Sequence, residues 1–105
     1  MRIYISGPIS DKEDLNRKAF KEVEELIRNK GHQPVNPHEV GKQIDGKSFD
    51  NLKDMYAEYM RLDIRALLDC QAIYLLRGWE RSKGCLIEVD IANVLHMQFI
   101  YEGEL

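Results

Sequence analysis

The chain has 105 residues, of which 44% are hydrophobic and 31% charged, as in one ordinary globular domain. Its net charge of −3 provides no basic surface for nucleic acid, and its apolar runs are far shorter than the ~20 residues of a membrane helix. The first residues form an apolar strand pattern rather than a signal peptide. We therefore expect a single cytoplasmic domain over residues 1–105, with no membrane or nucleic-acid partner.

The first half of the chain predicts a strand, a helix and a second strand. Residues 2–6 form an apolar run that ends in a turn. Residues 10–13 match a capping box with Ser10 as N-cap, so we expect a helix to begin there and to end at Gly31. Residues 32–35 then predict a short second strand, which an Asn-Pro pair closes.

The second half predicts two further helix–strand pairs after a long polar loop at residues 36–50. Helical spacing of apolar residues predicts a helix over 51–69. Residues 71–76 form a continuous apolar run, as expected for a buried parallel strand. A helix over 84–96 and a last strand over 97–101 complete the series.

This alternation of strands and helices predicts a parallel sheet with right-handed crossovers. We expect a small α/β domain of three layers, similar to flavodoxin or Rossmann domains, with about four strands in the order 2-1-3-4. The chain reverses direction between the first and third strands, and ligands bind at the carboxyl ends of strands at such a point. The predicted site therefore lies where residues 6–10 face residues 77–83.

Glu88 is the most unusual residue for its surroundings. It lies in the run 84–95, which has apolar residues on nearly every side. A buried carboxylate is costly unless it is paired, hydrogen-bonded or functional. Because a polar loop at 77–83 precedes this helix, we favour a functional role for Glu88.

Asp63 presents the same anomaly on the predicted helix over 51–69. It lies on the apolar stripe, three residues after Met60 and four before Leu67. Two carboxylates in different environments are typical of glycosidic-bond chemistry. The alternative is a structural role, in which Asp63 pairs with Arg61 or Arg65 or caps a nearby loop.

The polar loop at 77–83 has the composition of an anion site. It carries the cations Arg77, Arg81 and Lys83 together with Ser82, and it leads into a helix start. A solvated charged loop is the alternative. Trp79 stacks on a base, acts as a lid or folds back onto the sheet.

The cysteines and histidines indicate no metal site. The chain has two cysteines without a C-x-x-C pair, and its three histidines do not cluster at metal-ligand spacing. We expect buried, reduced cysteines, no metal and no cofactor.

Four parts of the chain together resemble one known family: residues 2–9 (RIYISGPI), 59–68 (YMRLDIRALL), 75–84 (LLRGWERSKG) and Glu88. They are similar to the nucleoside 2-deoxyribosyltransferase-like superfamily, in particular to small, largely uncharacterised bacterial and phage domains within it. A more distant similarity is to the 2′-deoxynucleoside 5′-phosphate N-hydrolases, whose loop after the first strand is richer in glycine and arginine.

The resemblance implies a role for each matching residue. Glu88 matches the nucleophile, Asp63 an aspartate that assists at the base or sugar, and Tyr4 a tyrosine near the sugar. Ser82 matches a serine that helps to hold a 5′-phosphate, and Gly84 a glycine at the helix start. The other expected substrate-binding residues are Ser6, Gly7, Pro8 and Ile9 of the first loop, with Gly78 and Trp79 of the second.

The implied activity is cleavage of the N-glycosidic bond of a 2′-deoxynucleoside or its 5′-monophosphate, by hydrolysis or by transfer, through a covalent glutamyl intermediate. The alternatives are a non-catalytic nucleotide-binding module and a purely structural oligomeric domain. The nearly all-apolar last helix predicts a homo-oligomer, a dimer or higher.

Overall fold

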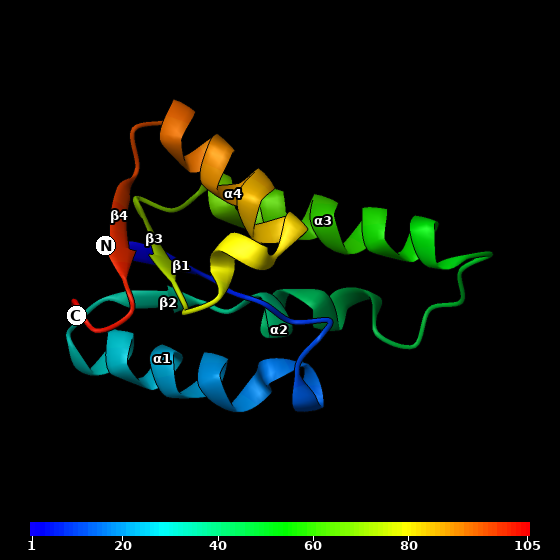
Figure 1. Ribbon diagram of the computed structural model, residues 1–105, viewed down its shortest axis with the longest axis horizontal. Helices are drawn as coiled ribbons and strands as arrows, with labels where there is room; N and C mark the ends of the chain where they lie inside the picture. The colour runs from blue at the N-terminus through cyan, green and yellow to red at the C-terminus, as the bar shows by residue number, and fades with distance from the viewer.

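The protein has a four-stranded parallel sheet with helices on both faces (Figure 1). A computed structural model describes residues 1–105. The sheet has the order β2-β1-β3-β4, and every neighbouring pair is parallel. This confirms the predicted fold class and strand order. The strands are β1 (Arg2–Ser6), β2 (Gln33–Val35), β3 (Ala72–Leu75) and β4 (Gln98–Tyr101).

Helix α1 packs on one face of the sheet, and α3 and α4 pack on the other (Figure 1). None of the helices has the length and apolar character needed to cross a membrane. The α-helices are α1 (Arg17–Asn29), α2 (Pro37–Val40), α3 (Leu52–Leu68) and α4 (Lys83–Val94). Three short 3-10 helices are η1 (Glu13–Asn16), η2 (Gly41–Ile44) and η3 (Trp79–Arg81).

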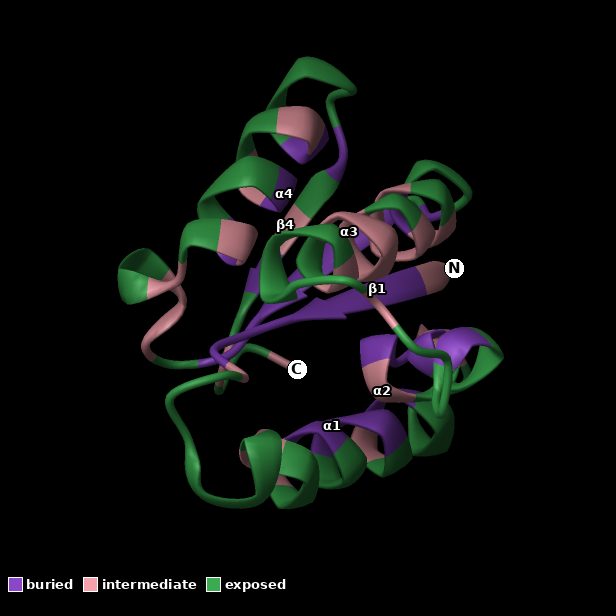
Figure 2. Ribbon diagram, turned by 90° about the vertical axis from the view of Figure 1, so that its right-hand side faces the viewer, coloured by how far each residue is buried: buried purple, intermediate pink, exposed green.

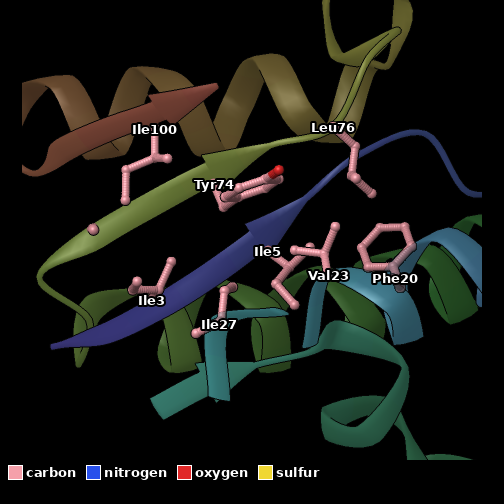
Figure 3. Packing of buried hydrophobic residues seen from close by; sticks show 9 residues of the cluster. Ile3, Ile5, Phe20, Val23, Ile27, Tyr74, Leu76 and Ile100 are labelled. Atoms are coloured by element: carbon pink, nitrogen blue, oxygen red, sulfur yellow. The ribbon is translucent and has the colours of Figure 1, made fainter. Parts of the chain in front are cut away.

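Alternation along β1 separates the core into two halves. Ile3 and Ile5 point toward α1, where they pack with Phe20 (Figure 3). Tyr4, between them, points to the opposite face and packs in the cluster that contains Leu67 of α3. The α3 and α4 side of the sheet therefore receives the polar end of Tyr4.

The predicted start of α1 is wrong. Ser10 does not cap a helix, and α1 begins at Arg17. Residues 14–16 have left-handed φ values of 48°, 54° and 60°. Asn16 Nδ2 donates a hydrogen bond to Pro8 O at 2.9 Å, so a side-chain bond holds a turn where helical backbone bonds were expected.

The predicted loop over 36–50 is partly helical. The Asn36 side chain accepts a hydrogen bond from His38 N at 3.0 Å, and Pro37 follows it as the first residue of α2. The pair that ends β2 therefore also begins α2. Helix η2 continues from α2 and lies beside α3.

Gly7 allows β1 and β3 to end close together. A β-carbon at position 7 would lie 2.7 and 2.8 Å from Leu76 Cδ1 and Cβ, closer than real side chains approach. The φ of Gly7 is not positive, so packing rather than backbone conformation requires glycine here.

We expect Gly7→Ala to lower the free energy of unfolding by about 1–3 kcal/mol, because the added methyl group overpacks against Leu76. Equilibrium unfolding in urea measures this change. Gly84→Ala is the matched control: its β-carbon would come no closer than 3.5 Å to Tyr56, and alanine favours the helix by up to ~1 kcal/mol. Wild-type stability in Gly7→Ala would contradict the close packing described above.

Candidate active site

A cavity of about 720 Å³ opens at the carboxyl end of β1. This is the edge of a parallel sheet where ligands bind, and the volume is typical of small-molecule sites. Figure 2 views the molecule from the side to which β1 leads, with α3 and α4 on one side of this strand and α1 and α2 on the other. The wall includes Tyr4, Ser6 and Gly7 from β1 and its end, Asp63 from α3 and Glu88 from α4.

The Glu88 carboxylate is held by two hydroxyl groups of β1. Tyr4 Oη donates a hydrogen bond to Oε2 at 2.6 Å, and Ser6 Oγ donates one to Oε1 at 2.7 Å. Residues 4 and 6 of a strand point to the same face, which explains how both hydroxyls meet one carboxylate. Glu88 is only 5% exposed and forms no salt bridge. These two hydrogen bonds therefore offset the free-energy cost of burying its charge.

The environment of Glu88 sets its protonation. Burial raises the pKa of Glu88 to about 6, although the hydrogen bonds from Tyr4 and Ser6 act to lower it. Burial and the negative charge of Glu88 raise the pKa of Tyr4 well above its usual range. At neutral pH Glu88 is therefore ionised while Tyr4 remains a hydrogen-bond donor.

Asp63 lies in the same cavity and has the opposite protonation. Two causes raise the pKa of Asp63 to about 8: burial, which is the larger, and the nearby charge of Glu88. Its Oδ1 atom is buried without a hydrogen-bond partner. Two carboxyl groups whose pKa values are separated in this way can act as a base or nucleophile and as an acid at the same pH.

The ion pair considered for Asp63 does not form. Arg61 pairs instead with Glu58 on the outer side of α3, and Arg65 makes no salt bridge. The protein leaves the buried Asp63 Oδ1 atom without a hydrogen-bond partner, and the residue lines the cavity.

The loop before α4 contributes two of its three cations to the cavity. Arg81, Ser82 and Lys83 line the wall, together with Gly84. Ser82 caps α4, since its Oγ accepts a hydrogen bond from Cys85 N at 3.3 Å. Arg77 faces away, where its Nε lies 3.0 Å from Glu102 Oε2.

Three residues expected at the substrate lie outside the cavity lining. Trp79 folds back onto the sheet, with its ring centroid 6.3 Å from that of Tyr101. Gly78 has a φ of 90°, which favours glycine in this turn. Pro8 packs against the turn, since its Cγ would lie 3.4 Å from a β-carbon at position 78. Ile9, by contrast, lines the cavity.

Several residues of the wall were not expected at the site. Tyr56 and Met60 lie seven and three residues before Asp63 on α3, so helical spacing from Asp63 could have identified them. His38 lines the opposite wall from α2, and no sequence signal pointed to it. Nowhere do three or more His, Cys, Asp or Glu side chains gather in a way that could hold a metal ion.

Comparison with known proteins agrees with this architecture. Residues 1–101 match the family described as a domain of unknown function, DUF4406. The chain belongs to this family. No curated protein matches the sequence.

A solved structure shares the whole fold of this family member. It is a 2-deoxyribosyltransferase from the psychrotolerant bacterium Bacillus psychrosaccharolyticus, described as a biocatalyst for the synthesis of antiviral and antitumoral nucleosides. The TM-score is 0.73 at 18% identity, and the match covers 100% of this chain and 76% of the other. The predicted resemblance is thereby confirmed at the level of the fold.

Proposed function

We propose that the protein cleaves the N-glycosidic bond of a 2′-deoxynucleoside or of its 5′-monophosphate. The observation that supports this most strongly is the pairing, in one cavity, of an ionised Glu88 held by Tyr4 and Ser6 with a protonated, unpartnered Asp63. The fold shared with a 2-deoxyribosyltransferase supports the same class of substrate.

In the first step, an oxygen of Glu88 attacks C1′ of the sugar and forms an ester bond. The bond between C1′ and the base nitrogen breaks, and its electron pair leaves with the base. Asp63 supplies the proton that the departing base needs. The hydroxyls of Tyr4 and Ser6 keep the Glu88 carboxylate oriented toward C1′.

In the second step, water or a second base attacks C1′, and the ester bond to Glu88 breaks. The Asp63 carboxylate takes up the proton that the attacking group loses, so both residues return to their starting states. Water gives hydrolysis and a second base gives transfer, with retention of configuration in either case. A 2′-deoxy sugar suits this route, because no 2′-hydroxyl destabilises the oxocarbenium-like transition state.

The cations of the cavity favour a phosphorylated substrate. Arg81 and Lys83 flank Ser82 at the start of α4, where a 5′-phosphate would also meet the positive end of the helix dipole. We therefore include 5′-monophosphates among the proposed substrates.

We also propose that the protein forms a homo-oligomer through α4. Leu86, Ile87 and Val94 of this helix and Leu95 directly after it are exposed, and Val94 is 74% exposed. Burying such side chains against a second copy is the simplest way to remove them from water.

We expect sedimentation velocity of the wild type to give at least the mass of a dimer. Val94→Asp should shift the protein toward the monomer, because it places a charge among the apolar side chains of α4. A monomeric wild type would exclude the proposal.

We expect the wild-type protein to release free base from at least one 2′-deoxynucleoside or 5′-monophosphate in a chromatographic screen, run with and without an acceptor base. Glu88→Gln should lower the rate by roughly 10³-fold or more, because the amide is a poor nucleophile. Glu24→Gln is the matched control, since Glu24 is equally buried at 5% but lies on α1, outside the cavity.

Each outcome of this screen has a definite meaning. Full activity of Glu88→Gln would exclude Glu88 as the nucleophile. Binding of nucleotides without any base release by the wild type would instead select a non-catalytic nucleotide-binding module.

We expect the pH profile of kcat/KM to be bell-shaped. Activity should rise as the pH increases through about 6, where Glu88 loses its proton, and fall above about 8, where Asp63 loses its own. Asp63→Asn should remove the alkaline limb and lower kcat by about 10²–10⁴-fold, because the amide cannot supply the proton. An unchanged alkaline limb in Asp63→Asn would contradict the role of Asp63 as the acid.

A further inference from the structure

Tyr56 of α3 lines the cavity and has no role in the steps above. Its hydroxyl lies against the first turn of α4: a β-carbon at position 84 would be 3.5 Å from Tyr56 Oη and 3.6 Å from Met60 Sδ. Because residue 84 is glycine, the space beside the Tyr56 hydroxyl stays open to the cavity.

The Tyr56 hydroxyl is a donor without a partner. The neighbouring Tyr59 donates a hydrogen bond to Asp45 at 2.9 Å, whereas Tyr56 forms no hydrogen bond within the protein. Burial and, to a smaller extent, the charge of Glu88 raise the pKa of Tyr56. The hydroxyl therefore keeps its proton at neutral pH. Tyr56 as a whole is 45% exposed, and it forms part of the cavity lining, where a ligand can reach it.

The positions of Tyr56 and Gly84 define the outer end of the site. Gly84 precedes Glu88 by four residues on one face of α4, which places it about 6 Å closer to the helix start. Tyr56 precedes Asp63 by seven residues on one face of α3. Glu88 and Asp63 thus form the inner end of the site, and Tyr56 lies one helical turn or more toward its mouth.

The inner and outer ends of the site correspond to the C1′ and 5′ ends of a deoxyribose. If C1′ lies at Glu88 and the base lies near Asp63, the rest of the sugar extends toward Gly84. The sugar substituent farthest from C1′ is the 5′-oxygen, which is present in both a nucleoside and its 5′-monophosphate. This oxygen then comes beside the Tyr56 hydroxyl.

We propose that the Tyr56 hydroxyl donates a hydrogen bond to the 5′-oxygen of the substrate, which makes Tyr56 a substrate-specificity residue. The inference rests on the proposed function, since that function places C1′ at Glu88. Gly84 contributes by leaving room for the 5′ group between α3 and α4.

The test pairs the removal of one hydroxyl on the protein with the removal of one oxygen on the substrate. Wild type, Tyr56→Phe and Tyr101→Phe are compared on a 2′-deoxynucleoside and on its 2′,5′-dideoxy analogue, with the base that is released fastest in the screen. Phenylalanine keeps the ring, so the comparison isolates the hydroxyl. Tyr101 lies on β4, outside the cavity, and is the matched control.

We expect Tyr56→Phe to lower kcat/KM about 3- to 10-fold on the 2′-deoxynucleoside, mainly through KM, which is the effect of one neutral hydrogen bond. On the 2′,5′-dideoxy analogue the variant should match the wild type, and Tyr101→Phe should match it on both compounds. An equal loss on both compounds, or no loss on either, would overturn the proposal.

A binding measurement separates this inference from the proposed function. If the wild type releases no base, the proposed function fails, and calorimetric titration with 2′-deoxyadenosine and 2′,5′-dideoxyadenosine replaces kinetics. A 3- to 10-fold weaker affinity of Tyr56→Phe for 2′-deoxyadenosine alone would still support the contact. Equal affinities of both proteins for both compounds, or no binding to the wild type, would overturn it.

Discussion

The structure of the site depends on the burial of one carboxylate, that of Glu88, against two hydroxyl groups of β1. A glutamate on the sheet-facing side of α4 would destabilise the domain without partners, and Tyr4 and Ser6 are the partners. The two hydrogen bonds join β1 to α4 at the carboxyl edge of the sheet. Burial raises the pKa of Asp63, and the nearby charge of the ionised Glu88 raises it further.

Several features of the backbone also position the site at the carboxyl edge of the sheet. Gly7 lets the chain leave β1 in contact with Leu76, and Ser82, which follows η3, caps α4. Tyr56 and Met60 of α3 meet the first turn of α4 at Gly84, where the absence of a side chain leaves space between the two helices. The chemistry proposed for the protein thus lies between two helices and the end of one strand.

Local patterns predicted some of these residues and missed others for identifiable reasons. Glu88 and Asp63 stood out because a charge on an apolar helix face is rare, and both line the cavity. The start of α1 was predicted too early, because the capping-box pattern is short and tertiary bonds such as that from Asn16 to Pro8 override it. Trp79 was ambiguous, since an aromatic side chain in a loop can face a ligand or the core, and here it packs toward Tyr101.

The sequence by itself determined the order of strands and helices, the parallel sheet and the two unusual carboxylates. These follow from the periodicity of apolar residues, which is local and depends only on neighbours along the chain. Tertiary structure alone decided which hydroxyls hold Glu88, that Asp63 remains without a partner, and that Tyr56 meets Gly84. Those contacts join residues 28 to 84 positions apart in the chain. They depend on how the helices pack against the sheet, which no single segment of the sequence determines.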